Sequence, residues 1–182
     1  MGEAINLINN YQIDNVIFNC GEYNNLENEL IELLDKNNIN YSSCINKLNI
    51  NDYDLKFLNT KEYDNENDNS SVLYFNYKKF KFLFMGDAGK IREKDILEKY
   101  NLKNITFLKV GHHGSNTSSS KEFINEIAPK YSLISVGRNN RYGHPKSEVL
   151  DNLLQSNIYR TDLNGGIEIK INNNKYQIKS CN

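Results

Sequence analysis

Two apolar runs of this chain end in the same way, and they constrain its fold more than any other feature. Residues 82–89 read Phe-Leu-Phe-Met-Gly-Asp-Ala-Gly, and residues 107–114 read Phe-Leu-Lys-Val-Gly-His-His-Gly. Short apolar runs that stop at glycine are typical of buried strands. Asp87, His112 and His113 follow these strands, and imidazole is the commonest metal ligand among side chains. The pattern predicts one site on one rim of a sheet.

Strand and helix patterns alternate along the chain, which favours an α/β fold. Leucines at helical spacing with glutamates between them predict an amphipathic helix over 24–37, after a strand at 16–18. Two β-rich runs, 71–77 and 80–85, are separated by two residues and predict an antiparallel hairpin. Residues 59–70 have almost no apolar content and predict a solvated loop without chemistry. The other expected elements are helices over 3–11, 91–100, 120–128 and 146–155, and strands near 39–41, 46–50, 54–58, 105–110, 131–136, 158–159, 167–171 and 176–178.

The residues at the two strand ends leave alternatives open. Asp87 either binds metal or caps the helix that follows. If the two histidines continue a strand, they point to opposite faces, so one is a metal ligand and the other orients a neighbour or contacts substrate. The pattern does not choose between them. Ser115 to Ser120 form an ordinary loop or present hydroxyls and helix amides to an anion; Ser119 and Glu122 have the spacing of a capping box.

A second cluster of polar residues follows the strand near 131–136. Its loop carries Arg138, Asn140, Arg141, Tyr142 and His144, and Pro145 suits the first turn of the next helix. Arginine suits phosphate and tyrosine can stack on a base, so a substrate loop is expected. The alternative is a plain surface loop. Further on, Asp162 is either part of a solvated turn or an acidic partner that orients a histidine from the second shell of the site.

Size and composition narrow the class of protein. With 182 residues the chain is expected to be one domain. A net charge of −1 gives no general attraction for nucleic acid or an anionic membrane, so any such contact would be local. No apolar run approaches 18 residues, and the first residues do not resemble a signal peptide. The odd number of scattered cysteines, Cys20, Cys44 and Cys181, predicts reduced thiols in a cytoplasmic protein.

These clusters, in this order, resemble the metallo-β-lactamase-fold domain at the C-terminus of the competence protein ComEC and its stand-alone relatives. The resemblance covers residues 71–171, and the pairing of His-His-Gly-Ser with Tyr-Gly-His-Pro is its most specific part. The matching segments are 83–88 with Glu93, 108–115 with 118–120, 134–137 with Asn140, 142–145, Val149, Leu150 and Leu153, and 159–162 with Gly165.

The resemblance implies an αββα sandwich of mixed sheets flanked by helices, which binds one or two zinc or manganese ions at one edge. It implies that Asp87 bridges the ions, that His112 or His113 binds one of them, and that the loop around His144 lines the substrate side. Such proteins are hydrolases, and the ComEC domain is thought to degrade DNA during uptake. Full-length relatives of that type are membrane proteins.

One part of the family pattern has no counterpart. Family members carry a histidine- and aspartate-rich motif in the first half of the fold, whereas no histidine precedes His112. The expectation is therefore an N-terminally incomplete domain over 1–182, with weak or incomplete metal binding, because zinc normally takes three or four protein ligands. The missing half would be a preceding segment or a second chain.

The most favoured function is metal-assisted hydrolysis of phosphodiesters or nucleic acid. The expected catalytic residues are Asp87, His112 and His113, and the expected substrate-binding residues are Ser115, Arg138, Asn140, Tyr142 and His144. The alternatives are a non-catalytic remnant or partner-binding domain, and a small-molecule phosphoesterase.

Overall fold

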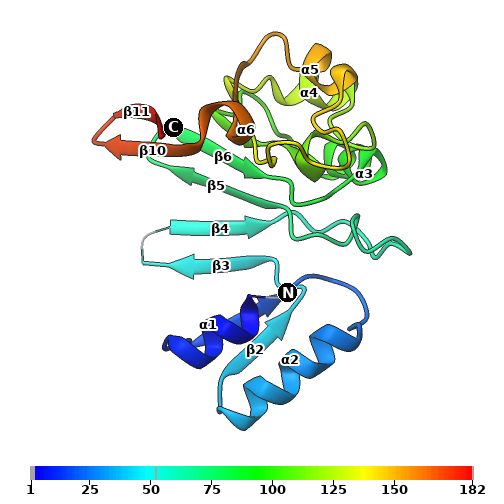
Figure 1. Cartoon of the computed structure of the whole chain (residues 1–182), viewed down its shortest axis with the longest axis vertical. Helices are drawn as coiled ribbons and strands as arrows, with labels where there is room; N and C mark the ends of the chain where they lie inside the picture. The colour runs from blue at the N-terminus through cyan, green and yellow to red at the C-terminus, as the bar shows by residue number, and fades with distance from the viewer. Residues whose placement is uncertain (1–2, 52, 182) are drawn as a thin grey trace. The chain divides into compact units, whose positions relative to one another are not determined.

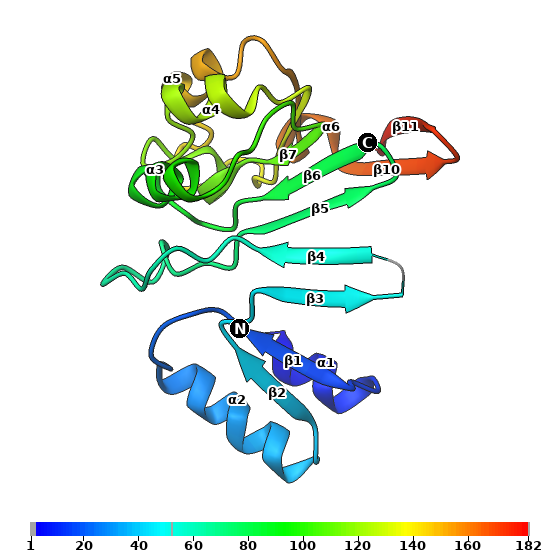
Figure 2. The ribbon, with the colours of Figure 1, turned by 180° about the vertical axis from the view of Figure 1, so that it is seen from behind.

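The computed structural model describes residues 3–51 and 53–181, which fall into two compact units, Met1–Ile45 and Asn46–Asn182. The first unit contains helix α1 (Ala4–Asn10), strand β1 (Asn15–Phe18), helix α2 (Asn25–Lys36) and strand β2 (Asn40–Ser43). β1 and β2 pair in parallel, and both strands and both helices of this unit can be followed in Figure 2. Phe18, Leu30 and Leu34 form its small core. α2 begins with a capping box in which the side chains of Asn24 and Glu27 satisfy each other's backbone amides.

A disulfide joins Cys20 to Cys44 in this unit, so the prediction of reduced thiols is wrong for these two residues. The physical reason is the parallel pairing of β1 with β2. Cys20 and Cys44 follow the same end of the two strands, and their Cα atoms lie 4.4 Å apart. Two cysteines 24 residues apart carry no local signal of that pairing. Cys181 is exposed and forms no disulfide.

The second unit is built on a seven-stranded mixed sheet in the order β3-β4-β5-β6-β7-β8-β9 (Figure 1). The strands from β3 to β6 pair antiparallel, and those from β6 to β9 pair parallel. The predicted antiparallel hairpin is confirmed as β5 and β6. The bounds are β3 Lys47–Ile50, β4 Tyr53–Phe57, β5 Leu73–Tyr77, β6 Phe80–Phe84, β7 Phe107–Lys109, β8 Tyr131–Ile134 and β9 Asn157–Arg160.

Helices follow the strands of the parallel half. The helical elements are α3 (Lys90–Lys99), the short turn η1 (Gly111–Gly114), α4 (Lys121–Ile127), α5 (Ser147–Asn152) and α6 (Thr161–Asn164), and a hairpin of β10 (Gly166–Asn172) and β11 (Lys175–Cys181) closes the chain. The mixed α/β class is therefore confirmed. Because β6, β7 and β8 run parallel, their carboxyl ends and the loops that follow lie at one edge of the sheet.

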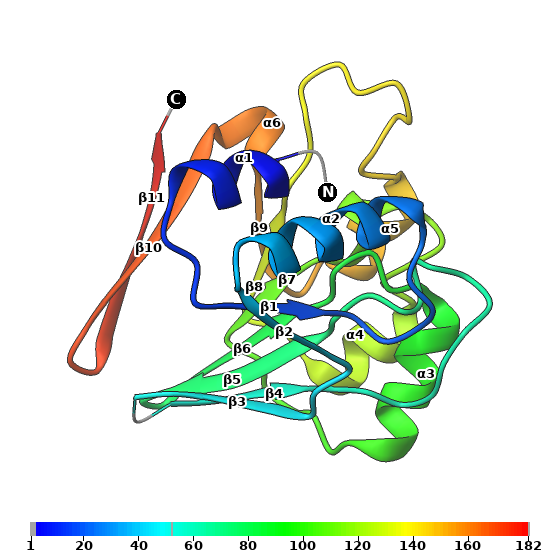
Figure 3. The ribbon, with the colours of Figure 1, turned by 90° about the horizontal axis from the view of Figure 1, so that it is seen from below.

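Each face of the sheet is covered by a different layer. Leu83, Leu108 and Ile134 belong to a buried cluster with residues of α3 and α4. Phe82 and Phe107 point the other way, where Ile169, Tyr176 and other hairpin residues cover them. Figure 3 shows the β10–β11 hairpin and the helices α3 and α4 on opposite sides of the strands. This layering follows from strand alternation, which gives every buried strand two apolar faces.

Three predictions about helix starts are wrong. Asp87 does not cap α3, because Gly89 occupies that position. The cap of α4 is Ser120, whose hydroxyl accepts a hydrogen bond from the amide of Phe123, and not Ser119. Pro145 precedes α5 instead of lying in its first turn, since the helix begins at Ser147. Each helix start thus lies one or two residues from its expected position, so the residue concerned does not cap the helix.

The loop over residues 59–70 is not the solvated excursion that its composition predicts. Asp68 and Asn69 are buried, and the loop folds against α3. Arg92 of α3 is only 1% exposed, and its guanidinium donates hydrogen bonds to the carbonyl of Leu58 and the hydroxyl of Thr60. A composition of polar residues cannot reveal this packing, because their partners lie about 30 residues away along the chain.

Candidate functional site

The two histidines lie in a turn after β7 and not on the strand itself. His112 and His113 both have left-handed backbone conformations, with φ of 46° and 54°. The two histidines therefore do not continue the strand, and the expectation from strand alternation does not apply to them. Gly114, with φ of 81°, ends the turn, and an added Cβ there would lie 2.5 Å from Pro145. The glycines around the pair thus permit a tight turn that keeps both rings at the rim.

Asp87 and His113 lie next to each other at this rim. The Oδ1 atom of Asp87 is 3.6 Å from Nε2 of His113. Nδ1 of His113 is 2.7 Å from the backbone carbonyl of Ser135, which follows β8. Because a carbonyl only accepts hydrogen bonds, Nδ1 carries a proton. Nε2 then presents a lone pair toward the aspartate side when the ring is neutral, and a proton when it is charged.

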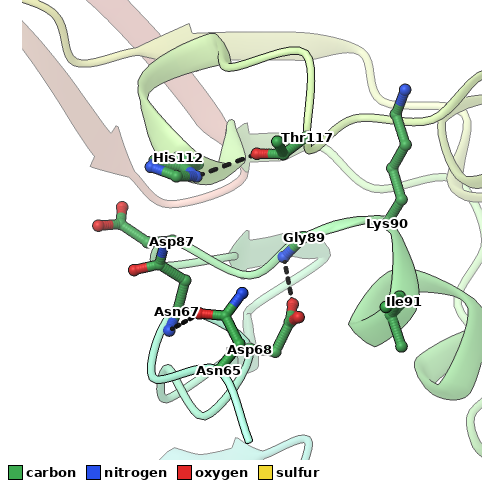
Figure 4. Close-up of a pocket in the computed structure, with 9 residues that line it drawn as sticks. All are labelled: Asn65, Asn67, Asp68, Asp87, Gly89, Lys90, Ile91, His112 and Thr117. Carbon is green, nitrogen blue, oxygen red and sulfur yellow. Dashed lines mark hydrogen bonds between the residues drawn. The ribbon is translucent and has the colours of Figure 1, made fainter. Parts of the chain in front are cut away.

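His112 contacts the loop that follows the turn. Its Nδ1 shares a hydrogen bond of 3.2 Å with the hydroxyl of Thr117 (Figure 4). His112 and Asp87 also line one cavity of about 280 Å³. The other residues around this cavity are Asn65, Asn67, Asp68, Gly89, Lys90, Ile91 and Thr117. The sequence-predicted Asp87, His112 and His113 are thus brought together at the carboxyl ends of β6 and β7.

His144 joins the group from the loop before α5. Its ring centroid is 6.1 Å from that of His112 and 5.7 Å from that of Tyr142, on which it stacks. Burial lowers the pKa of His144, and the charges of Lys146, His112 and His113 lower it further. Nδ1 of His144 is buried and has no hydrogen-bond partner among the described residues. The neutral ring tolerates this arrangement, whereas the imidazolium would bury an unpartnered N–H.

We expect His144 to make the protein less stable as the pH falls. Its folded-state pKa lies below the value near 6.5 of the unfolded chain, so the unfolded state binds more protons between those two pKa values. The stabilisation from the neutral ring is therefore complete above about pH 6.5 and is lost as the pH falls below it. Urea titrations of the wild type and of His144→Gln from about pH 7.5 to about pH 5 check this prediction, because that range brackets the histidine pKa of the unfolded chain. The variant should show a smaller loss, and an identical pH dependence in both proteins would contradict it.

Three other residues predicted to bind substrate, Asn140, Tyr142 and Arg138, differ in their contacts and exposure. Asn140 shapes its own loop: its Oδ1 accepts from the amide of His144, and its Nδ2 donates to the carbonyls of Gly137 and His144. Tyr142 is 59% exposed and lies within reach of the Arg141 guanidinium. Arg138 is exposed, and its Nε donates to the backbone carbonyl of Asp162. The two arginines and the tyrosine are thus exposed to solvent, whereas Asn140 and His144 are partly buried.

Ser115 and Asp162 make structural contacts. Ser115 is buried, and its hydroxyl lies 3.0 Å from that of Thr117. Both carboxylate oxygens of Asp162 accept from Arg160, at 3.0 and 2.6 Å. The Arg160 guanidinium holds the pKa of the Asp162 carboxyl below its usual range. Asp162 and Arg160 thus form an ion pair. The role of Asp162 as the partner of a histidine stays a prediction.

The sequence analysis missed two charged groups near Asp87. Asp68 accepts a hydrogen bond of 2.7 Å from the amide of Gly89 and lines the cavity beside Asp87. Lys109 on β7 is half-buried, and its ammonium donates to the carbonyl of Val110 at 2.9 Å. Burial lowers the pKa of Lys109, while the charge of Asp87 acts in the opposite direction. The position of Lys109 inside an apolar strand was a visible signal, whereas nothing in the polar run around Asp68 singled it out.

The residues present do not form a complete metal centre. Among residues 3–51 and 53–181, no group of three or more His, Cys, Asp or Glu side chains is arranged to hold a metal ion. Asp87 and His113 form a pair, and zinc normally takes three or four protein ligands. We therefore derive no catalytic step through a metal from these residues alone. Within the part of the chain that the structure describes, no helix has the length and apolar character needed to span a bilayer.

The chain is similar in sequence to several curated bacterial proteins. It is 38% identical to ComE operon protein 3 of Bacillus subtilis over 110 residues, which are 59% of this chain and 14% of that protein. It is 38% identical to competence protein ComA of Neisseria gonorrhoeae over 122 residues, 63% of this chain and 17% of that protein. It is 29% identical to recombination protein 2 of Haemophilus influenzae over 118 residues, 64% of this chain and 15% of that protein.

No family model matches the chain. The aligned stretch spans only 14% to 17% of the length of the three relatives. The chain thus resembles a short part of much longer proteins, one of which is named for competence and another for recombination.

Proposed function

We propose that this chain acts in DNA uptake, and that its Asp87 rim is part of a metal-dependent phosphodiesterase site of the metallo-β-lactamase type. The observation that carries the proposal is the pairing of the Asp87 carboxylate with His113 at 3.6 Å, with His112 and His144 beside them. One relative named as a competence protein and another named as a recombination protein support a role with DNA. In this proposal the mixed sheet with helices on one face is one half of the αββα sandwich.

The loop between β8 and α5 suits a nucleic acid strand. Arg138 and Arg141 are exposed cations, and Tyr142 presents an exposed ring. Guanidinium groups bind phosphate oxygens in a fork, and aromatic rings stack on unpaired bases. With an overall charge of −1, attraction for DNA would be confined to this local group. A single-stranded substrate fits these residues better than a rigid duplex.

The proposal also requires ligands from outside the described set. The pair Asp87 and His113 leaves zinc or manganese short of protein ligands, so another segment or a second chain would complete the site. We expect weak metal binding and little or no turnover by this chain alone. The carboxylate would hold the cation, and His113, oriented by the Ser135 carbonyl, would present Nε2 to the same position.

The test measures metal binding and DNA cleavage together. Zinc and manganese affinities of the purified chain would be determined by calorimetry for the wild type, Asp87→Ala and, as a matched control, the exposed Asp151→Ala. We expect Asp87→Ala to weaken the affinity by about tenfold or more, since even outer-sphere partners contribute that much. The control should be unchanged. Equal affinity of the wild type and Asp87→Ala would refute the proposal.

A second candidate function is binding without catalysis, and the lack of a three-residue metal cluster among the described residues favours it. Cleavage of a labelled single-stranded oligonucleotide, of bis-p-nitrophenyl phosphate and of a phosphocholine ester separates the possibilities. The first two substrates report a phosphodiesterase, and the third a small-molecule phosphoesterase. Oligonucleotide binding that needs Arg138 and Arg141, with no metal-dependent cleavage of any substrate, would favour the non-catalytic function.

A further inference from the structure

In the backbone turn that carries Asp87, each of the four amides from Asp87 to Lys90 donates a hydrogen bond. The amide of Ala88 donates to the carbonyl of Met85 within the turn. The amide of Lys90 donates to the carbonyl of Thr117 at 2.8 Å, from the loop that also contacts His112. The remaining two amides, those of Asp87 and Gly89, donate to side chains of the 65–70 loop. Two neighbouring loops therefore determine the path of this turn.

Asp68 makes the shorter of those two side-chain contacts. Its Oδ1 accepts from the Gly89 amide at 2.7 Å, at the first turn of α3 (Figure 4). Asp68 is 5% exposed, so this bond is shielded from competing water. Loss of this acceptor would leave the Gly89 amide without a hydrogen-bond partner, which costs free energy in a place shielded from water. No other residue between 59 and 70 holds the turn with a carboxylate.

Ser70 makes the second contact and fits closely below the turn. Its hydroxyl oxygen accepts from the Asp87 amide at 3.1 Å. Gly86 has a φ of 58°, and an added Cβ there would lie 2.8 Å from Cβ of Ser70. An added Cβ at Gly89 would likewise lie 3.0 Å from Oδ1 of Asp68. The turn and the loop thus lie so close that a side chain at Gly86 would clash with Ser70, and one at Gly89 would press on Asp68.

We propose that Asp68 and Ser70 are positioning residues, which orient the Asp87 carboxylate toward His113 by holding the backbone on both sides of it. This inference rests on the function proposed for the Asp87 rim and extends it to a loop whose composition indicates no chemistry. Asp68 acts through the Gly89 amide and not as a ligand. What matters is therefore an acceptor at the Oδ1 position, and the negative charge of the carboxylate is secondary.

The experiment follows the His113 ring directly. In labelled full-length chain, the imidazole carbon–proton signals of His113 are recorded by NMR for the wild type, Asp87→Ala, Asp68→Ala and Asp68→Asn. Asp64→Ala, an exposed aspartate of the same loop, is the matched control. We expect Asp68→Ala to move the His113 signals toward their positions in Asp87→Ala, by about half of that displacement. Asp68→Asn keeps the Oδ1 acceptor, so it and the control should match the wild type.

Two outcomes would overturn the proposal. One is a folded Asp68→Ala protein with unmoved His113 signals. The other is an Asp68→Asn protein whose signals move as far as those of Asp68→Ala, which would show that the charge acts directly. Thermal melting checks the folding of each variant. Should Asp68→Ala not fold, Ser70→Ala decides, because it removes only the acceptor of the Asp87 amide.

The readout separates this proposal from the proposed function. If the wild type neither binds metal nor cleaves DNA, the His113 signals still report whether the loop orients Asp87. If both proposals hold, Asp68→Ala should lower zinc affinity by about the factor of ten that outer-sphere partners typically contribute, while Asp68→Asn should restore it. A lower affinity in Asp68→Ala with unmoved His113 signals would count against positioning.

Discussion

Phe107→Ala is expected to lower the free energy of unfolding of the unit over residues 46–182 by about 3–5 kcal/mol, the usual cost of emptying a buried phenylalanine site. Phe107 is 1% exposed at the centre of the sheet. Its ring stacks on Phe82 at 4.9 Å and on Tyr131 at 5.5 Å, and it meets the edge of Tyr176 from β11 at 5.2 Å. Truncation removes apolar contacts and leaves a cavity beneath the hairpin. Urea denaturation followed by circular dichroism measures the effect.

Phe84→Ala is the matched control on the same face of the sheet. Phe84 is 38% exposed and its nearest aromatic partner is Phe75, at a centroid distance of 6.0 Å. We expect a loss of about 1 kcal/mol or less, because a partly exposed ring loses little burial when it is removed. Similar losses for both variants would contradict the structure, since they would mean that the β10–β11 hairpin does not cover Phe107.

The parts of the fold that were predictable from sequence are those with a local cause. Helix α2 follows from leucines at helical spacing, and the β5–β6 hairpin follows from two β-rich runs separated by two residues. The rim of the sheet was predictable too, because an apolar run that stops at glycine marks a strand end. The juxtaposition of Asp87 with His113 follows from β6 and β7 being parallel neighbours.

What sequence reasoning missed depends on contacts between distant segments. The Cys20–Cys44 disulfide requires the parallel pairing of β1 with β2. The burial of Asp68 requires the loop to fold against the turn of Gly89, 21 residues away. The left-handed histidine pair is followed by Gly114, which lies close to Pro145 of a later loop. Hydrophobic periodicity carries no information on any of these three features, because none lies within one helix or strand.

Glu93→Ala is expected to cost about 3 kcal/mol of stability, because it removes the shared acceptor of two backbone amides. Glu93 on α3 is 1% exposed, and its carboxylate oxygens accept from the amides of Ser119 and Ser120, the latter at 2.9 Å. Burial raises the pKa of Glu93, and the amide donors act in the opposite direction. The expectation that these amides present a free site to an external anion is therefore wrong, since the protein's own carboxylate occupies it.

The consequences of Glu93→Ala reach the histidines through the 115–120 loop. That loop carries Thr117, whose hydroxyl contacts His112 and whose carbonyl holds the Lys90 amide. Loss of Glu93 would leave two donors unpaired in a buried place, and the loop would move to hydrate them. Urea denaturation measures the stability, and the NMR signals of His112 report the loop.

Glu98→Ala, an exposed residue of the same helix, should change stability by no more than about 0.5 kcal/mol. Glu93→Gln keeps one carbonyl acceptor, so its stability should lie between those of the wild type and Glu93→Ala. A Glu93→Gln protein as unstable as Glu93→Ala would mean that both amides need the full carboxylate.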